Sequence, residues 1–179
     1  MKHNITITKG TPKDIPAFLQ YFRTSIPHHF PQYSQNLIGF LVDVDYGPQW
    51  LKDQFKKGNK RILLARSGTQ IVGYLLYTLP NAGVAYGDWI GVDKEYRKQG
   101  VASQLLAAWE KDAFADGAHN LHLWTYDYNV AFYTNRGFTN GGVMRKGWAG
   151  EDGYFMYKLL REPEERNYLK RYLQKIKKG

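Results

Sequence analysis

Cysteine is absent from this sequence of 179 residues. Its absence excludes disulfide bridges, thiolate catalysis and cysteine-ligated zinc. Long apolar runs are absent too, and none approaches the roughly 20 residues that a membrane-spanning helix needs. The first four residues lead into a strand-like pattern rather than the apolar segment of a secretion signal. These absences predict a soluble, cytoplasmic protein with no membrane partner.

Aromatic residues, by contrast, are plentiful. The chain has 14 Tyr, 9 Phe and 5 Trp, and 43% of its residues are hydrophobic. A disordered chain lacks this aromatic content, and the length favours one domain with a substantial core. We expect a single domain over residues 1–160, followed by a basic tail with a helical pattern over residues 161–179.

Basic residues outnumber acidic ones, and the formal net charge is +9. A basic surface attracts anions in general, so nucleic acid and the phosphates of a cofactor are both candidate partners. No zinc-finger or RNP-type motif is present, and the basic residues are scattered, which disfavours nucleic acid. The tail carries seven Lys or Arg against three Glu. It is a candidate for docking on the body, for a homodimer contact or for simple solvation.

Hydrophobic periodicity predicts one mixed α/β domain. Thr11 is expected to cap the first helix, with an acid, Asp14, three residues later. Pro27 is expected to end that helix near Ser25 and to leave residues 26–33 as a loop. The other expected helices lie at 37–41, 48–58, 100–116, 129–136 and in the tail. The expected strands lie at 5–7, 61–66, 71–79, 84–92, 121–126, 138–145 and 154–160.

The most informative segment, residues 89–103, reads as a strand, a basic turn and a helix. The first N–H groups of a helix have no intrahelical partner and lie at the positive end of its dipole. Gly100 and Ala102 leave this backbone accessible, and Arg97 and Lys98 add positive charge. The segment is therefore suited to bind a diphosphate, although spacing alone fits an ordinary tight turn equally well. It is neither a P-loop nor a GxGxxG fingerprint.

Residues 97–102, with the sequence RKQGVA, resemble the Arg/Gln-x-x-Gly-x-Gly/Ala motif of the GNAT (Gcn5-related N-acetyltransferase) family. The resemblance implies a central mixed, mostly antiparallel sheet flanked by helices, with acetyl-CoA as the acyl donor. It further implies that the backbone at 90–92 pairs with the pantetheine arm and that the amides of 98–103 hold the pyrophosphate. The cofactor-binding residues implied in this way are Ile90, Gly91, Val92, Arg97, Lys98, Gln99, Gly100, Val101, Ala102, Ser103 and Asn129.

A second stretch, residues 126–138, resembles the family pattern in which Asn, Ala and Tyr precede Gly-Phe. The resemblance implies that Tyr133 protonates the departing CoA thiolate as a general acid. Without the resemblance, Tyr133 reads as a packed aromatic on an amphipathic helix. Asn129 resembles the family asparagine that contacts the cofactor, but it lies four residues before Tyr133 instead of seven. Capping of the helix is therefore an alternative role for Asn129.

A general base is harder to identify. The amine must be neutral to attack a thioester, so a proton has to leave it. Trp124 occupies the position where some relatives carry Glu, whereas Asp88 is the only carboxylate on the strand before the basic turn. A carboxylate among aromatic residues can have a raised pKa suited to a base. A surface acid without a catalytic role, His122 as base and a water relay are the alternatives.

The two motifs together favour an N-acetyltransferase that uses a ternary complex of enzyme, acetyl-CoA and a primary amine. A noncatalytic acyl-CoA-binding module is the alternative, and the presence of Tyr133 argues against it. The sequence leaves open whether the acceptor is a small molecule or a protein amine. Residues 26–33, with Asp43 and Asp45, are another candidate region for a cationic acceptor. No metal site is expected, because the spacing of the histidines suits no single ion.

Overall fold

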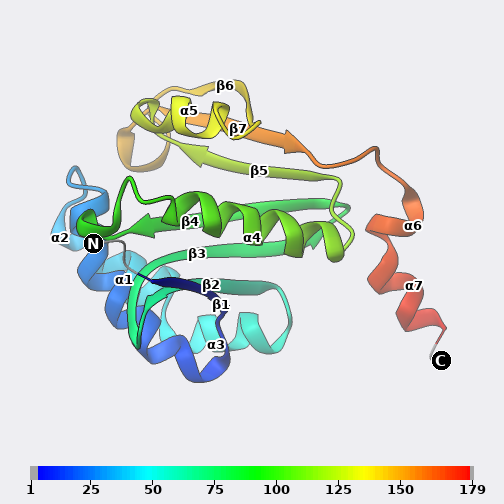
Figure 1. Cartoon of the computed structure of the whole chain (residues 1–179), viewed down its shortest axis with the longest axis horizontal. Helices are drawn as coiled ribbons and strands as arrows, with labels where there is room; N and C mark the ends of the chain where they lie inside the picture. Colours follow the sequence, from blue (N-terminus) through cyan, green and yellow to red (C-terminus); the bar gives the residue numbers. More distant parts are fainter. Residues whose placement is uncertain (1–3, 178–179) are drawn as a thin grey trace. The chain divides into compact units, whose positions relative to one another are not determined.

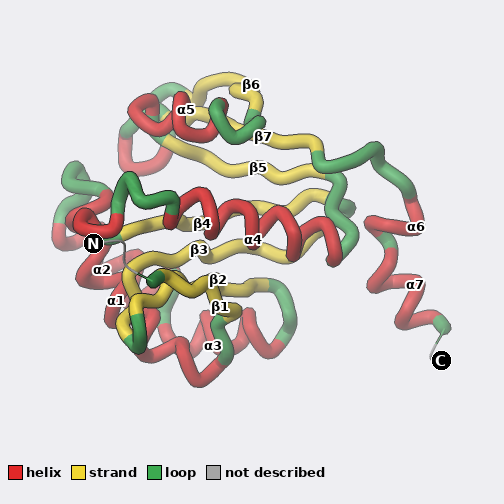
Figure 2. Tube along the Cα trace, in the orientation of Figure 1, coloured by secondary structure: helices red, strands yellow, loops and turns green. Residues whose placement is uncertain are grey.

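The computed structural model describes residues 4–177. Helices and strands follow one another in the predicted order, with boundaries mostly within one or two residues of the predicted ones (Figures 1 and 2). The elements are β1 (Ile5–Lys9), η1 (Pro12–Asp14), α1 (Ile15–His29), α2 (Gln35–Phe40), the π-helical η2 (Leu41–Asp45), α3 (Pro48–Lys56), β2 (Lys60–Ser67), β3 (Gln70–Asn81), β4 (Val84–Val92), η3 (Lys94–Tyr96), α4 (Val101–Ala115), β5 (Asn120–Thr125), α5 (Asp127–Thr134), β6 (Thr139–Met144), η4 (Trp148–Gly150), β7 (Gly153–Leu159), α6 (Glu165–Tyr168) and α7 (Lys170–Ile176).

Seven strands pair in the order β1-β2-β3-β4-β5-β7-β6. Strands β4 and β5 run parallel, with Val84 opposite Asn120 and Gly87 opposite Leu123. The β1–β2, β5–β7 and β6–β7 pairs are antiparallel. The predicted fold class, a mixed sheet flanked by helices, is confirmed.

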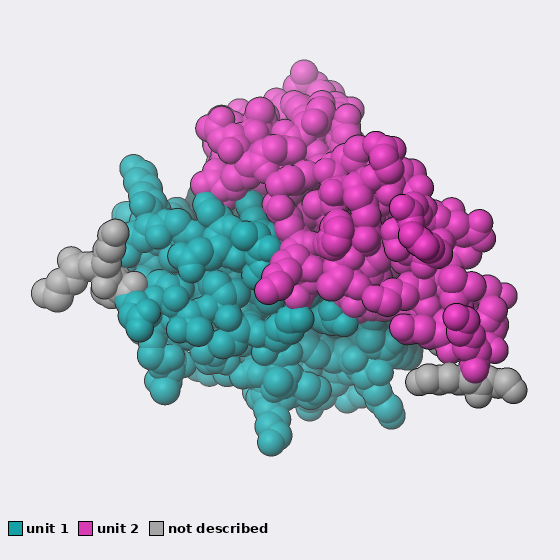
Figure 3. All heavy atoms as spheres, turned by 45° about the vertical axis from the view of Figure 1, so that its right-hand side comes forward, with its two compact units in different colours: residues 1–77, 89–108 teal, residues 78–88, 109–179 magenta. Residues whose placement is uncertain are grey.

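The chain divides into two compact units (Figure 3). Unit 1 holds the described residues up to Tyr77 together with Trp89–Ala108, and unit 2 holds Thr78–Asp88 and the described residues from Trp109 onward. Strands β3 and β4 and helix α4 each contribute residues to both units. The predicted single domain over 1–160 stays a prediction.

An aromatic core holds unit 1 together. Tyr74 on β3 is fully buried, and its ring meets the rings of Phe18 and Phe22 on α1 at centroid distances of 5.4 and 5.6 Å. Phe22 also meets Trp89 on β4, at 5.4 Å. Full burial of a large apolar side chain contributes about 1.5–3 kcal/mol. This core therefore fixes α1 against the strand from which the basic turn begins.

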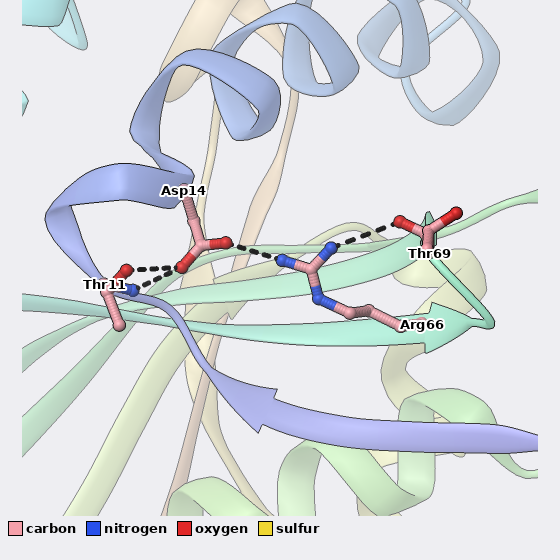
Figure 4. A network of polar contacts seen from close by, with 4 residues as sticks. All are labelled: Thr11, Asp14, Arg66 and Thr69. Atoms are coloured by element: carbon pink, nitrogen blue, oxygen red, sulfur yellow. Dashed lines mark hydrogen bonds and ion pairs between the residues drawn. The ribbon is translucent and has the colours of Figure 1, made fainter.

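The start of the first helix is held as the sequence predicted (Figure 4). One carboxylate oxygen of Asp14 accepts hydrogen bonds from the backbone N–H (2.8 Å) and the hydroxyl (2.7 Å) of Thr11. The other accepts from Arg66 on β2, at 2.7 Å. Arg66 also donates to the carbonyl of Thr69, at 3.3 Å. These contacts lower the pKa of Asp14, with the bonds from Thr11 contributing more than Arg66.

The prediction that Pro27 ends the first helix near Ser25 is wrong. Helix α1 runs through Pro27 to His29, so residues 26–29 are not part of a loop. The proline removes only the hydrogen bond to the carbonyl of Arg23, which is an exposed residue. Ile26 before it is fully buried, and His29 after it is anchored to β4. Packing on both sides of the proline therefore outweighs the cost of the lost bond.

In unit 2, β5 buries alternate residues: Leu121, Leu123 and Thr125 face one side. Two helices cover that side. A Cβ added to Gly87 on β4 would lie 3.0 Å from the Trp109 ring of α4, and the Thr125 side chain is hydrogen-bonded to Tyr133 of α5. Helix α5 packs against β6 and β7. Both helices therefore lie on the side of this part of the sheet to which Leu123 points.

The tail forms two short helices instead of the single one that was predicted. Helix α6 ends at Tyr168, where Leu169 leaves the helical conformation, and α7 follows. Arg161 donates to the carbonyls of Ala118 (2.9 Å) and Phe114 (2.7 Å), and Lys170 donates to that of Ala115 (3.2 Å). Cations beside the carbonyl end of a helix are stabilising. The described part of the tail therefore contacts the C-terminal end of α4.

Residues 1–3 and 178–179 lie outside the described part of the chain. The expectation for the first three residues and the last two positions of the predicted tail therefore lie outside the described residues. No helix within residues 4–177 has the length and hydrophobicity to cross a membrane.

Candidate functional site

The predicted phosphate-binding segment lies between the end of β4 and the start of α4, all within unit 1. A short helical turn, η3, leads into four turn residues, in which Lys98 and Gly100 have positive φ angles of 59° and 81°. The first intrahelical bond of α4 runs from the N–H of Gln104 to the carbonyl of Gly100, at 3.0 Å. The amides of Val101 and Ala102 precede it, so no helix carbonyl lies four residues behind them. This segment is called the cradle below.

Gly100 is suited to the cradle for two reasons. Its φ of 81° lies in the left-handed region that glycine adopts without a steric penalty. A Cβ added there would meet only the Gln104 side chain, at 4.0 Å, so the space above the backbone is open. Lys98 beside it is exposed. An accessible helix N-terminus beside a lysine fits the negative charge of a pyrophosphate.

The strand end that leads into the cradle is firmly anchored. The Val92 carbonyl receives a hydrogen bond from His29 Nε2 at 3.1 Å and another from Arg97 Nε at 3.0 Å. The next residue, Asp93, donates its N–H to the Val72 carbonyl at 2.9 Å and accepts from the Tyr21 hydroxyl at 2.6 Å. Helix α1 and strand β3 therefore both hold the point where β4 turns into the cradle.

The charge of Arg97 stays beside the turn, but its N–H groups are engaged structurally. Its Nη2 donates to the carbonyl of His28 at 3.5 Å, in addition to the bond to Val92. Gln99 bonds back to the Glu95 carbonyl, at 2.7 Å. The predicted contacts of Arg97 and Gln99 with a cofactor stay predictions.

On β4 itself, Gly91 leaves room for the ring of His29. A Cβ at this position would lie 2.4 Å from Cε1 of His29 and 2.8 Å from the Tyr74 ring. Burial, supported by the nearby charge of Arg97, lowers the pKa of His29 to about 4. His29 is therefore neutral at pH 7, and the Nε2 that faces the Val92 carbonyl carries its proton.

Tyr133 lies in unit 2 and is only 4% exposed. Its ring makes edge contacts with Phe132 and Phe138 at 5.1 and 5.6 Å, and its hydroxyl is hydrogen-bonded to Thr125. Burial raises its pKa above the ordinary value of 10.0. Tyr133 therefore stays protonated at neutral pH, which a proton donor requires.

Asn129 is the third residue of α5 and not its cap. The helix begins after Tyr126, and the N–H of Asn129 donates to the Tyr126 carbonyl at 3.0 Å. The Asp127 side chain accepts from the N–H of Tyr128, at 2.7 Å. Capping by Asn129, the alternative role considered for it, is therefore excluded. Contact with a cofactor stays a prediction.

Asp88 and His122 both lie in unit 2 on the side opposite Leu123. Asp88 is half-buried and accepts a hydrogen bond from the Thr78 hydroxyl at 3.1 Å. The His122 ring stacks on Tyr86 at 4.9 Å, and burial lowers the pKa of His122. The two candidate bases therefore occupy the same side of neighbouring strands.

The sequence analysis did not identify four residues whose hydrogen bonds hold the cradle and the candidate catalytic residues in position: Tyr21, His29, Thr78 and Thr125. Each acts across strands or between a helix and a strand, so periodicity carries no signal for it. Asp43, considered as part of an acceptor region, forms an ion pair with Arg23. Within residues 4–177, no group of three His, Asp or Glu side chains is arranged to hold a metal ion.

Known proteins resemble this chain in sequence and in fold. The sequence model described as "Acetyltransferase (GNAT) family" matches residues 18–138. Among curated proteins, no sequence match is significant. The fold resembles PaiA N-acetyltransferase from Thermoplasma acidophilum, solved in complex with coenzyme A, with a TM-score of 0.71 and 19% identity over 87% of this chain and 99% of that one.

Two further solved structures have the same fold. One is a GNAT-family acetyltransferase from Streptococcus pneumoniae, with a TM-score of 0.69, 23% identity and coverage of 87% and 99% of the two chains. The other is ribosomal-protein-alanine N-acetyltransferase from Brucella melitensis, with a TM-score of 0.68, 23% identity and coverage of 86% and 99%. The family match spans the cradle, Asp88 and Tyr133. This chain is a member of the GNAT acetyltransferase family.

Proposed function

We propose that the protein is an acetyl-CoA-dependent N-acetyltransferase that acetylates a primary amine. The observation that carries the proposal is the cradle, an open and basic helix N-terminus with Gly100 at its entrance. Acetyl-CoA would bind with its pyrophosphate on the amides of residues 98–103. The backbone of Ile90, Gly91 and Val92 would face the pantetheine arm. Acetyl-CoA supplies the activated acyl group when it is bound.

In the proposed reaction the amine nitrogen attacks the thioester carbonyl carbon directly. A nitrogen–carbon bond forms and the carbon–sulfur bond breaks. Asp88 takes the proton that leaves the attacking nitrogen, and the hydroxyl proton of Tyr133 goes to the departing thiolate. This mechanism requires Tyr133 to be protonated and Asp88 to be ionised. Tyr133 is supported by its place in the stretch 126–138, which resembles the family pattern, and Asp88 is supported by its acceptor bond from Thr78.

The experiment is an acceptor panel with acetyl-CoA, in which release of the free CoA thiol is followed. The panel should contain monoamines, polyamines, amino acids and peptide N-termini. We expect thiol release that depends on both the amine and the enzyme. Binding of acetyl-CoA without acetylation of any amine would instead favour the noncatalytic acyl-CoA-binding module.

A further inference from the structure

One side of the β4–β5–β7 segment in unit 2 carries a run of neighbouring aromatic residues. Tyr86 lies opposite His122 in the parallel pair, and His122 lies opposite Tyr157 in the antiparallel one. Trp124 lies opposite Phe155. Residues directly opposite one another share a side of the sheet, as do residues two apart on a strand. This surface, called the aromatic face below, consists of Tyr86, His122, Trp124, Trp148, Phe155 and Tyr157.

The rings of the aromatic face form a continuous series. His122 stacks on Tyr86 at 4.9 Å and lies 5.6 Å from Phe155. Phe155 lies 5.3 Å from Trp124, which in turn lies 6.2 Å from Trp148. The rings on the strands are half-buried, and Trp148 is 52% exposed. Gly141 and Gly153 make room for the series, since a Cβ at Gly141 would lie 2.7 Å from Phe155 and one at Gly153 would lie 3.2 Å from Trp124.

The helices of unit 2 that pack on these strands lie on the other side. Trp109 of α4 lies against Gly87, and Tyr133 of α5 is bonded to Thr125, both of which point away from the aromatic face. The tail bonds to carbonyls at the C-terminal end of α4. Within the described part of unit 2, the aromatic face is therefore the side on which α4 and α5 do not lie.

A carboxylate lies near one of these rings, that of Tyr86. Asp88 is two residues beyond Tyr86 and so faces the same side of β4. Burial and the charge of Asp88 together raise the pKa of Tyr86 to about 12, so the field of this carboxylate reaches the aromatic face. Burial lowers the pKa of His122, which favours the uncharged form of its ring. The combination of aromatic rings with one negative charge is complementary to a cation that carries a ring.

We infer that the aromatic face binds the acceptor and that the acceptor is a small primary amine attached to an aromatic ring. Its ring would stack on Trp124 and Phe155, and its ammonium group would lie towards Asp88. The inference rests on the proposed function, since it names the substrate class of that reaction. A two-fold dimer contact centred on this face would bring two Asp88 charges together, which disfavours a second copy as occupant.

The test compares 2-phenylethylamine with 2-cyclohexylethylamine, which has nearly the same size and charge but no aromatic ring. We expect kcat/KM to be roughly 3- to 10-fold higher for the phenyl compound, the range that ring stacking adds beyond buried area. Trp124→Leu should abolish this preference, whereas Trp124→Phe, which keeps a ring, should retain most of it. Tyr172→Leu, at an aromatic residue of α7 that is 59% exposed, is the control and should change nothing.

A separate binding experiment distinguishes failure of this inference from failure of the proposed function. Saturation-transfer NMR of both amines, without acetyl-CoA, reports binding whether or not acetylation occurs. Selective binding of the phenyl compound that Trp124→Leu abolishes supports the aromatic face even if no amine is acetylated. Acetylation of both amines at equal rates overturns the inference and leaves the acetyltransferase intact. Loss of a dimer in Trp124→Leu by light scattering, with no change in acceptor preference, would also overturn it, because a second copy would then occupy the face.

Discussion

The Nε2 atom of His29, at the end of α1, lies 3.1 Å from the carbonyl oxygen of Val92, at the end of β4. This hydrogen bond joins the first helix to the strand that the cradle follows. His29 Nδ1 is buried, with no hydrogen-bond partner among the described residues, as expected of a neutral ring. The pair therefore makes the position of the strand end depend on an uncharged histidine.

The first prediction concerns the effect of pH on this pair. The pKa of His29 is about 4 in the folded protein against 6.5 for a free histidine, so between these values only the unfolded state gains a proton. The contribution of His29 to the free energy of unfolding should therefore be complete above pH 6.5 and should decrease as the pH falls towards 4. His29→Gln keeps a donor and does not titrate. Urea unfolding at several pH values should show a shallower decrease for this variant than for wild type, and parallel curves would contradict the assignment.

The second prediction separates positioning from stability at the same residue. His29→Leu removes the hydrogen bond to Val92, whereas His29→Gln preserves it. One hydrogen bond contributes about 1 kcal/mol, so the KM for acetyl-CoA should rise about 5-fold in His29→Leu with kcat little changed. His29→Gln should recover most of the affinity. Steady-state kinetics at saturating amine measures both values, and equal KM values in the two variants would limit His29 to a role in stability.

The third prediction tests the cradle. Acetyl-CoA should raise the melting temperature of wild type, because a ligand that binds only the folded state stabilises it, by about 2.7 kcal/mol at 100 times its Kd. Gly100→Glu should abolish the shift, since a side chain and a negative charge would occupy the proposed phosphate position. Gly68→Glu is the matched control: this turn glycine also has a positive φ, of 59°, and open space around it. A folded Gly100→Glu protein that binds CoA as tightly as the control would place the cofactor elsewhere.

The fourth prediction concerns Tyr133. Tyr133→Phe keeps the packed ring and removes the acidic proton, so kcat should fall by roughly 100-fold with acetyl-CoA affinity little changed. Loss of the partner of Thr125 should reduce stability by about 1 kcal/mol as well. Tyr128→Phe, on the same helix but 61% exposed, should leave both kcat and stability unchanged. Rates of Tyr133→Phe equal to wild type would show that the thiolate leaves without this donor.

The fifth prediction concerns Asp88 as the base. Asp88→Asn should lower the rate most at low pH, where the amine is largely protonated, and the defect should shrink as the pH approaches the pKa of the amine. Thr78→Val removes a hydrogen bond that stabilises the charged carboxylate, so it should move the acidic limb of the pH–rate profile to higher pH. A profile of Asp88→Asn that stays parallel to wild type would leave His122 or a water relay as the base.

Local patterns were sufficient for most of the fold. The spacing of Thr11 and Asp14 predicted the start of the first helix, and alternation located the strand Val84–Val92. Gly117 and Gly137 directly follow the predicted helices at 100–116 and 129–136, and they have positive φ angles of 97° and 81°. These features depend on residues close together in the chain, which is why the sequence alone determined them. The family resemblance likewise rested on the contiguous stretches 97–102 and 126–138.

Tertiary packing decided the remainder. Pro27 reads as a helix end, yet burial of Ile26 and the bond from His29 to Val92 carry α1 past it. Those partners are separated by 63 positions, so no local pattern contains the bond. The aromatic face likewise arises only when the register of three strands brings Tyr86, His122 and Trp124 to one side. The sequence alone determined the elements and the cradle. Long-range pairing decided which side chains lie next to one another, because strand register and helix packing arise only in the folded sheet.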